Sequence, residues 1–435
     1  MKPAQIEASL DSLVEAELPA LVDCYKMLHA MPELSGQEEK TSAFLAGELR
    51  SLGFTVTEGL GKFSQQSWRG FGVVGVLSNG AGPTVLVRAD MDALPVEEKT
   101  GLPYASKVKA SFGGEAQQVC VMHACGHDVH VTSLIGTARV LARLKESWCG
   151  TLVLIGQPAE EGGGGAQAML HDGAYDLCPQ PDCVLALHVT AQLPAGMVGY
   201  APGNFMASLT EVEITMRGVG AHGSAPERAK DPIVMAAQLV LALQTIVSRE
   251  VNPLEPAVLT VGSIHGGTAS NVIPDQVVLQ LSIRSYDDAV RDQIVASLER
   301  MARGVALTAG VPEDRAPLVH RKTSHPANYN DPQLTERVAC SLQRALGEPA
   351  VFRAPPVMAS EDFGYWGLVR TVPTCMFWLG AADPVQFRQS QETGIPVPSN
   401  HSPLFAPLPE PTIRTGVKAS AASVLDLLGR PSAAR

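Results

Sequence analysis

The sequence lacks the cysteine spacing of a zinc ribbon or of a disulfide-stapled domain. Its eight cysteines are scattered along 435 residues, and none of them forms a Cys-x-x-Cys pair. A chain of this length buries enough apolar surface to need no staples, so most of these cysteines should be small buried hydrophobic residues. Cys125 is the exception, because it lies in the segment HACGHD, where histidines and an acidic residue are its neighbours.

Positive charge is also scarce, with 33 lysines and arginines against 44 aspartates and glutamates and a net charge of -11. This balance opposes a phosphate-binding surface and makes nucleic acid a poor partner. The N-terminal segment carries acids at positions 7, 11, 15, 17 and 23, so it lacks the basic start and the apolar core of a signal peptide. No continuous apolar run is long enough to cross a bilayer. We therefore expect a cytoplasmic protein without a membrane partner.

Hydrophobic residues make up 45% of the chain and charged residues 18%, which is typical of globular domains, and the length predicts two of them. Short apolar runs at 84–90, 151–157 and 183–189 are typical of strands that are covered on both faces. Between the first two, the segment 128–145 has the apolar spacing of a helix. This β-α-β order predicts an α/β domain with an open sheet flanked by helices.

The pattern changes after residue 203. Strand, helix, strand, strand, helix and strand signals follow at 211–217, 231–247, 258–265, 277–285, 287–307 and 318–322. This is the order of a split ferredoxin-like α+β domain. Helix and strand signals then resume after residue 331. We predict a first domain built from residues 1–203 and 326–435, interrupted by an inserted domain at 204–325.

Acidic residues and histidines follow the apolar strands of the first domain. In an open α/β sheet, ligands bind beyond the carboxyl ends of the strands, so these residues are candidates for one site. They are Asp90 and Asp92 after the first strand, Cys125 and His127 before the helix, Glu160 and Glu161 after the second strand, His188 on the third strand and His401 in a later loop. Five thiol, imidazole and carboxylate side chains that converge from separate loops exceed the four ligands of a closed structural site, which favours a centre with two metal ions.

Glu160 and Glu161 are consecutive, so one can bind metal while the other holds the attacking water. A metal ion lowers the pKa of bound water towards about 7, and a free glutamate can accept the proton and return it to the leaving nitrogen. Taken alone, paired acids in a loop more often cap a helix or face solvent. Asp92 suits the role of orienting a ligand better than that of being one.

Three polar residues of the inserted domain form a second set. His222 lies in a glycine-rich turn, Asn271 in another turn and Arg284 at the end of a strand. A donor, an amide and a cation are what a site needs to hold an oxyanion and a substrate carboxylate. From spacing alone, structural roles are slightly favoured for all three.

Several motifs are long enough to carry a family signature. They include RADMDALP, HACGHD, QPAEEGGGGA, GVGAHGSAPE, NVIPD, SEDF and NHSP. Together they resemble metallopeptidase family twenty, in the amidohydrolase branch of hippurate hydrolases, N-acyl-amino-acid hydrolases and auxin-conjugate hydrolases. The resemblance runs from about Met31 to Leu427. It implies an α/β domain with two metal ions and an inserted lid domain that also forms the contact of a homodimer.

The resemblance also implies roles for single residues. Cys125 takes the place that bridges the two ions, and the remaining ligands are His127, Glu161, His188 and His401. Glu160 matches the general acid/base, and Asp92 matches the acid that supports the metal site. His222 matches a lid histidine that stabilises the oxyanion in the partner subunit's site, while Asn271 and Arg284 match lid positions associated with substrate binding. Mixed ligation of this kind suits zinc, manganese, cobalt or nickel.

We therefore predict a metal-dependent amidohydrolase that cleaves the amide bond between an acyl or aroyl group and an amino acid. A dipeptidase or carboxypeptidase with the same centre is the alternative. An aroyl group needs an apolar pocket, for which the candidates are Phe205, Met206, Trp366 and Phe377. A third possibility is a binding protein that kept the fold and lost catalysis, but such proteins usually lose a ligand or the base first, and all of them are present here.

Overall fold

The computed structural model describes residues 3–63, 68–111, 118–368 and 371–429, and it divides into two compact units. The first unit comprises residues 1–203, 329–355 and 365–435, and the second comprises residues 204–328 and 356–364. Residues 326–328 and the short segment 356–364 were predicted to belong to the first domain, and both fall in the second unit. The segment 356–364 joins the second unit because the Ala207 N–H donates to the Ala359 carbonyl and Met206 forms a β-bridge with Val357. No local sequence pattern announces such long-range contacts.

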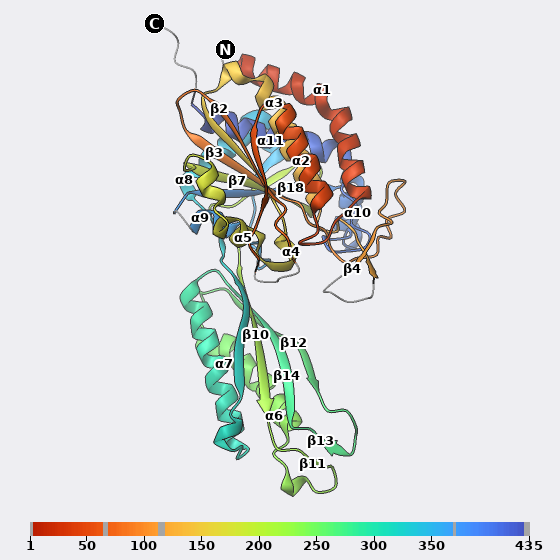
Figure 1. Ribbon diagram of the computed structural model, residues 1–435, viewed down its shortest axis with the longest axis vertical. Coiled ribbons are helices and arrows are strands. Elements are labelled where there is room, and N and C mark those ends of the chain that lie inside the picture. Colours follow the sequence, from red (N-terminus) through yellow and green to blue (C-terminus); the bar gives the residue numbers. More distant parts are fainter. Residues whose placement is uncertain (1–2, 64–67, 112–117, 369–370, 430–435) are drawn as a thin grey trace. The chain divides into compact units, whose positions relative to one another are not determined.

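The first unit is built on one open, mixed sheet of eight strands (Figure 1). Its order is β1 (Thr55–Leu60), β2 (Gly72–Asn79), β6 (Gly150–Gln157), β3 (Thr84–Asp90), β7 (Cys183–Pro194), β18 (Thr374–Ala382), β8 (Val198–Tyr200) and β17 (Val351–Arg353). The four central strands β6, β3, β7 and β18 are parallel to one another. On one side β2 pairs antiparallel with β6 and with β1, and on the other side β8 pairs antiparallel with β18 and parallel with β17. The predicted open α/β sheet is confirmed, with antiparallel pairing on both sides of the parallel core that the sequence did not indicate.

Helices cover the sheet of the first unit. Three of them pack together, namely α1 (Pro3–Ala30), α3 (His127–Arg143) and α11 (Pro409–Leu427), and α3 and α11 contact the sheet. The helix α8 (Pro332–Leu346) packs against α11, and α2 (Glu39–Ser51) packs on β1 and β2. Every residue of β3 and β6 is buried, which explains why these strands read as unbroken apolar runs. Shorter elements are β4 (Lys109–Ser111), β5 (Gln118–Cys120), α4 (Glu160–Gly163), α5 (Gly165–His171), α9 (Gly364–Leu368) and α10 (Pro384–Thr393).

This topology brings the candidate residues of the first unit to one edge of the sheet. The parallel strands β3 and β6 are in register, with Asp90 opposite Gln157, so both end at the same level. The helix α4 begins with Glu160, after a turn of two residues that follows β6, and α3 begins with His127. The carboxyl ends of the strands and the start of α3 therefore frame a single place where ligands can bind.

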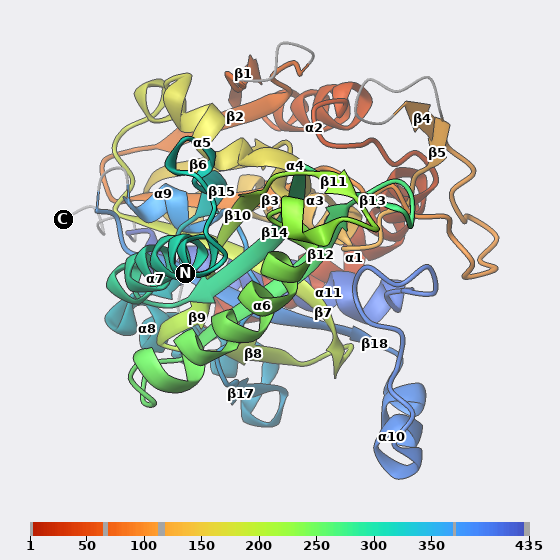
Figure 2. The ribbon, with the colours of Figure 1, turned by 90° about the horizontal axis from the view of Figure 1, so that it is seen from below.

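The second unit is a four-stranded antiparallel sheet with two helices. The sheet order is β12 (Ala257–Gly266), β14 (Gln276–Ser285), β10 (Ser208–Arg217) and β15 (Leu318–His325), and Figure 2 shows α6 (Pro232–Thr245) and α7 (Asp288–Thr308) running beside these strands. Buried residues alternate along β10 and β14, as expected of a sheet with one face on a core. The predicted ferredoxin-like order is confirmed. The short strands are β9 (Gly203–Met206), β11 (Ala221–His222), β13 (Val272–Ile273) and β16 (Asn328–Asn330).

One helical stretch of the second unit, Pro232–Glu250, is long and apolar enough to cross a membrane. The expectation that no such stretch exists was therefore too strict, because it required an unbroken apolar run and Gln238 and Gln244 interrupt this one. Its buried residues, among them Leu239 and Leu243, belong to the core of the second unit. Core helices pass the same test of length and composition, so this stretch alone is weak evidence for a membrane span.

Candidate metal centre

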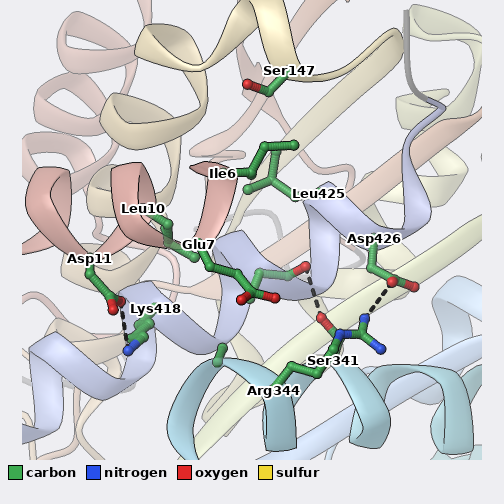
Figure 3. Close-up of a pocket in the computed structure, with 12 residues that line it drawn as sticks. Ile6, Glu7, Leu10, Asp11, Ser147, Ser341, Arg344, Lys418, Leu425 and Asp426 are labelled. Atoms are coloured by element: carbon green, nitrogen blue, oxygen red, sulfur yellow. Dashed lines mark hydrogen bonds and ion pairs between the residues drawn. The ribbon is translucent and has the colours of Figure 1, made fainter. Parts of the chain in front are cut away.

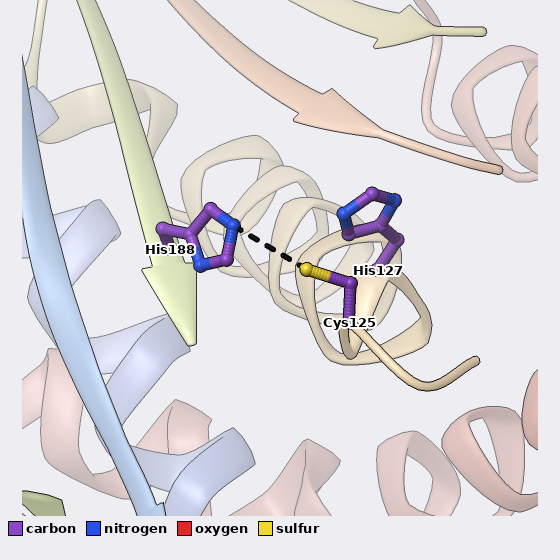
Figure 4. A group of neighbouring side chains, drawn as sticks. All are labelled: Cys125, His127 and His188. Atoms are coloured by element: carbon purple, nitrogen blue, oxygen red, sulfur yellow. Dashed lines mark hydrogen bonds between the residues drawn. The ribbon is translucent and has the colours of Figure 1, made fainter. Parts of the chain in front are cut away.

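Four segments of the first unit bring together the side chains of a metal centre. Three overlapping groups have potential ligand atoms within 4.8 Å of one another, and they are Cys125, His127 and His188, then His127, Glu160 and Glu161, then Cys125, Glu161 and His401. Figure 4 shows the Cys125 thiol directed at His188, with His127 beside it at the start of α3. All five predicted ligands and the predicted base therefore meet at one place.

The glycine between Cys125 and His127 explains the spacing of these two residues. Gly126 adopts a left-handed conformation with φ 84° and precedes the first turn of α3. A Cβ atom at this position would lie 2.4 Å from Cγ1 of Val189 on β7. Only glycine allows both this conformation and such a close approach, so the Cys-Gly-His segment can pack directly on the strand that carries His188.

The hydrogen bonds of His188 and His127 fix which nitrogen faces the centre. The Nδ1 atom of His188 donates to the Val189 carbonyl at 2.8 Å, so its Nε2, 3.7 Å from the Cys125 sulfur, carries a lone pair. Burial lowers the pKa of His188 to about 3, which keeps the ring neutral. The Nδ1 atom of His127 donates to Asp92 at 3.2 Å, and its buried Nε2 has no hydrogen-bond partner among the described residues. Both rings thus offer Nε2 as a ligand atom.

His130 also lies near this centre, yet both of its nitrogens are occupied. Its Nδ1 donates to Asp90 at 2.5 Å, and its Nε2 accepts the N–H of Val189 at 2.9 Å. The second carboxylate oxygen of Asp90 is bound by Arg88 at 2.5 Å, so Asp90 is held from two sides. His130 and Asp90 therefore form a buried network behind the ligands.

Asp92 connects the two halves of the centre. Its Oδ1 accepts from His127, and its Oδ2 accepts the N–H of Glu161 at 3.0 Å and the hydroxyl of Ser35 at 2.6 Å. Burial lowers the pKa of His127, but the nearby carboxylates of Asp90 and Asp92 outweigh burial and raise it to about 10. Asp92 therefore lies where it can orient the His127 ring.

His401 and Glu161 close the remaining side. The Nε2 atom of His401 lies 3.2 Å from Oε1 of Glu161, and the backbone N–H of His401 donates to the Ala124 carbonyl at 2.7 Å. His401 has a left-handed backbone with φ 69°, which is unusual for a residue with a side chain. Strain of this kind clusters at functional sites.

Asn400 is a residue of this site that the sequence did not reveal. Its amide nitrogen donates to the carbonyls of Cys125 and Val189, each at 3.1 Å, and its oxygen accepts the N–H of Ala191 at 3.2 Å. One side chain thereby ties the loop of His401 to the segments of Cys125 and His188. The only available signal was its position next to His401, and an asparagine in a loop has many commoner roles.

The comparisons with known proteins agree with this geometry. Residues 86–393 match the model of peptidase family M20/M25/M40, which is more than half of the chain. The chain belongs to this family.

Relatives within the family carry names of hydrolases. The chain is 38% identical to an N-acetyl-L-cysteine deacetylase of Bacillus subtilis over 80% of its length and 77% of the relative. It is also 38% identical to a hippurate hydrolase of Campylobacter jejuni, over 78% of its own length and 82% of the relative. A thermostable carboxypeptidase of Saccharolobus solfataricus is 34% identical over 92% and 93%. The predicted resemblance is confirmed, and the protein is an M20 metallo-amidohydrolase.

A solved structure of the same family extends the likeness to the fold. The YXEP protein of Bacillus subtilis, described as a dinuclear metal-binding peptidase of family M20, matches with a TM-score of 0.74 at 27% identity. The match covers 95% of this chain and 99% of that one. This neighbour and the ligand groups above support two divalent ions for this M20 enzyme.

The residues themselves fit such ions. Burial, followed by the carboxylates of Glu161 and Glu160, raises the pKa of the Cys125 thiol well above its ordinary value. A thiolate enclosed in this way needs positive charge beside it, and a divalent cation supplies that charge. The buried Nε2 of His127 is a second indication, because it lies 3.6 Å from Oδ2 of Asp90 but makes no hydrogen bond to the described residues, which is costly for a polar atom in the interior. Thiolate, imidazole and carboxylate together suit borderline divalent metals.

The remaining predicted site residues lie in the second unit. His222 ends β11 and is exposed, and its Nδ1 accepts the N–H of Ser224 at 3.1 Å, which leaves the proton of the neutral ring on Nε2. Asn271 is exposed next to β13, where its carbonyl accepts the N–H of Gly223 at 2.7 Å. Arg284, on β14, is half-buried and donates to the Met358 carbonyl at 2.8 Å. The first two residues thus share one small ribbon, and Arg284 lies apart from it.

The four apolar residues proposed for an aroyl pocket lie in the interior. All four side chains are buried at 3% exposure or less, namely Phe205, Met206, Trp366 and Phe377. Trp366, for example, donates its indole N–H to Gln157 at 2.8 Å inside the first unit. Large hydrophobic residues are the normal filling of a core, and sequence cannot separate them from the lining of a pocket.

A pocket of about 330 Å³ lies between α1, α8 and α11 (Figure 3). Its cations are already paired, with Lys418 2.6 Å from Asp11 and Arg344 2.6 Å from Asp426. Leu10 in the pocket wall and His29 lie nineteen residues apart on α1, which corresponds to roughly 28 Å of helix. His29 marks the position of the metal centre, because it contacts Asp128, the residue after His127. This pocket is therefore remote from the metal centre.

Proposed function

We propose that the protein hydrolyses the amide bond of N-acyl or N-aroyl amino acids. The observation that carries the proposal is the group formed by His127, Glu160 and Glu161, which places an acid beside two metal ligands. The names of the deacetylase and hippurate hydrolase relatives describe substrates of this kind. A small acyl-amino acid also suits a chain whose net charge disfavours large anionic partners.

In the proposed reaction, Glu160 holds the attacking water and takes one of its protons. The oxygen of that water forms a bond to the carbonyl carbon, the carbon–nitrogen bond then breaks, and Glu160 returns the proton to the leaving amine. The products are a carboxylic acid and a free amino acid. When bound, zinc, manganese, cobalt or nickel ions would supply the positive charge that polarises the carbonyl and lowers the pKa of water. Asp92 keeps the His127 ring and the backbone of Glu161 in place during the reaction.

For the second unit, we propose that His222 stabilises the oxyanion and that Asn271 and Arg284 bind the substrate. The resemblance of their motifs supports these roles, and for His222 the Nε2 proton is a suitable donor. Replacing His222 with alanine should lower kcat far more than it raises KM. Equal activity of the variant would remove His222 from the mechanism.

We further propose a cytoplasmic homodimer that contacts its partner through the second unit. The strand β12 ends the four-stranded sheet, and the exposed side of α6 carries Ile233, Val234 and Leu241. Unpaired strand edges and exposed apolar side chains favour association. Sedimentation of the wild type and of Leu241→Glu should give a dimer and a monomer, and a monomeric wild type would refute the proposal.

A carboxypeptidase or dipeptidase is the second candidate function. It is favoured by the thermostable carboxypeptidase among the relatives, which covers nearly the whole chain. Turnover of benzoyl-glycine and acetyl amino acids against that of glycyl dipeptides separates the two functions. Metal-stripped protein resupplied with zinc, manganese or cobalt should show which ion supports each activity.

The mechanism is tested by replacing Glu160 with glutamine. Glutamine has the same shape but cannot accept a proton, so we expect normal metal content and a loss of turnover of about a thousandfold, within the range of general base catalysis. Glu97→Gln, an exposed replacement in the same unit, is the matched control and should leave both quantities unchanged. Retained turnover in the Glu160 variant would exclude it as the base.

A further inference from the structure

The turn that carries Glu160 is strained. Ala159, the preceding residue, is fully buried and has a left-handed backbone with φ 52° and ψ 44°. This conformation is unfavourable for a residue with a Cβ atom. A turn held in it relaxes unless its surroundings fix it. We therefore asked which groups hold the backbone on either side of Glu160.

Glu38 holds the backbone before Glu160. Its carboxyl group is fully buried, and Oε1 accepts the N–H of Ala159 at 2.8 Å and the N–H of Gly36 at 3.0 Å. Burial, followed by the charge of Asp92, raises the pKa of Glu38 to about 8. Its Oε2 is also buried and has no hydrogen-bond partner in the described part of the chain. Burying a carboxyl group with one oxygen unbonded costs free energy of folding. The hydrogen bond of Glu38 to the turn is therefore not an incidental surface contact.

The helix that starts at Glu38 does not use this side chain. Glu38 is the N-cap residue of α2, yet among the described residues its carboxyl group accepts no bond from that helix. The carboxylate of Glu33 instead accepts the N–H groups of Lys40 and Thr41, at 3.1 and 2.8 Å. Capping of α2 is thus supplied from outside, which leaves Glu38 available for Ala159.

Asp92 holds the backbone after Glu160. Its Oδ2 accepts the N–H of Glu161 at 3.0 Å and the hydroxyl of Ser35 at 2.6 Å. Ser35 and Glu38 belong to the same loop between α1 and α2. Two buried carboxyl groups, both contacted by this loop, therefore bind the N–H groups directly before and directly after Glu160.

We propose that Glu38 is a positioning residue for Glu160, because it fixes the left-handed turn at Ala159 from which the Glu160 side chain is directed at the metal centre. The proposal rests on the proposed role of Glu160 as the base. Glu38 itself touches neither water nor substrate in this scheme. It acts only through the Ala159 peptide.

The first test compares three variants. Glu38→Ala removes the acceptor, so kcat should fall about a hundredfold, as expected of a misplaced catalytic group, with KM and metal content close to the wild type. Glu38→Gln keeps an oxygen at the same place and should retain kcat within about threefold, since a hydrogen bond to a neutral acceptor is retained. Glu39→Ala is the matched control, because Glu39 is the exposed neighbour on the same helix. Wild-type kcat in Glu38→Ala, or an equal loss in Glu38→Gln, would overturn the proposal.

A second test covers the case in which Glu38→Ala does not fold. Glycine adopts the left-handed conformation without strain, so Ala159→Gly should make the turn less dependent on Glu38. The double variant Glu38→Ala/Ala159→Gly should then recover part of the lost kcat, whereas a purely structural role for Glu38 predicts no recovery. Absence of recovery in a folded double variant counts against positioning.

Hydrogen exchange separates this proposal from the proposed function. The amide of Ala159 should exchange faster in Glu38→Ala than in the wild type, and Glu38→Gln should restore its protection, in metal-free and metal-loaded protein alike. This result is independent of which substrate the enzyme accepts. Unchanged exchange would refute the positioning role, whereas changed exchange in a protein without amidase activity would refute only the role of Glu160.

Discussion

Replacing Asn400 with alanine should weaken the metal centre without removing a ligand. The Asn400 side chain makes three hydrogen bonds to backbone groups of the Cys125 and His188 segments, at 3.1, 3.1 and 3.2 Å. Its amide nitrogen also lies 4.0 Å from the Cys125 sulfur. The variant leaves two carbonyls and one N–H without this partner and releases the loop that carries His401.

The size of the effect follows from these contacts. A net contribution of about 1 kcal/mol for each hydrogen bond gives a loss of about 2 to 3 kcal/mol in the free energy of unfolding, since the side chain is half-buried. Loss of a group that orients metal ligands weakens metal binding by about tenfold to a hundredfold in other sites. Asn400→Asp should be worse for the metal-free protein, because its oxygens would face two carbonyl oxygens.

Asn79 provides a matched control within the same unit. Its amide nitrogen also donates to two carbonyls, those of Lys145 and Trp148, each at 2.7 Å. It lies at the end of β2, opposite Gly150 at the start of β6, and therefore at the other edge of the sheet. Asn79→Ala should destabilise the protein by a similar amount and leave metal affinity unchanged.

Two measurements decide the outcome. Urea unfolding of the metal-free variants gives the free energies, and competition with a chromophoric chelator gives the zinc affinities. If Asn400→Ala binds zinc as tightly as the wild type, or if Asn79→Ala weakens zinc binding equally, then the Asn400 side chain does not organise the ligands. The reasoning from its hydrogen bonds would then be wrong.

Two further predictions concern stability. Gly36 and Gly101 both have φ 73°, but a Cβ at Gly36 would lie 2.8 Å from the Trp68 ring, whereas Gly101 has nothing within 4 Å. Urea unfolding should show a cost of about 1 kcal/mol for Gly101→Ala and about 1 to 3 kcal/mol more for Gly36→Ala, and equal costs would contradict the contact. The second prediction concerns His29. Burial lowers its pKa, but hydrogen bonds to Asp128 and Glu98 outweigh burial and raise the pKa from 6.5 to about 10. The contribution of charged His29 to the free energy of unfolding is therefore complete below pH 6.5 and disappears as the pH rises through 10. His29→Gln should therefore cost about 3 kcal/mol at pH 6 and much less at pH 10.5, and a loss independent of pH would count against the charged pair.

The sequence predicts the parts of the fold that depend on local pattern. The unbroken apolar runs match β3, β6 and β7, since a strand covered on both faces has no polar side. The strands of the second unit, with their alternating buried residues, and its two helices were predicted from local pattern in the same way. The position of segment 356–364 was not predicted, because it depends on backbone hydrogen bonds to residues about 150 positions away, such as that from Ala207 to Ala359.

The site is predictable where chemistry and topology coincide. Thiol, imidazole and carboxylate side chains at the ends of parallel strands meet because those ends lie at one edge of the sheet. Asn400 and Glu38 were not predicted, because their roles depend on hydrogen bonds to backbone groups that only the folded chain brings near. Trp366 and Phe377 could not be assigned from sequence for a related reason, since sequence alone does not separate an apolar core residue from one that lines a pocket.

Three buried histidines in or beside the centre, His127, His130 and His188, show what decides a role that residue type leaves open. His127 and His130 lie one turn apart on α3, a spacing that by itself suits two ligands on one helix face. The two residues differ in what their Nε2 atoms contact. His127 and His188 each use Nδ1 for an oxygen acceptor and keep Nε2 for the centre, whereas His130 also gives its Nε2 to the Val189 N–H. Replacing His130 should therefore act by releasing Asp90 and Val189, and metal should still bind, whereas replacing His127 removes a ligand atom outright.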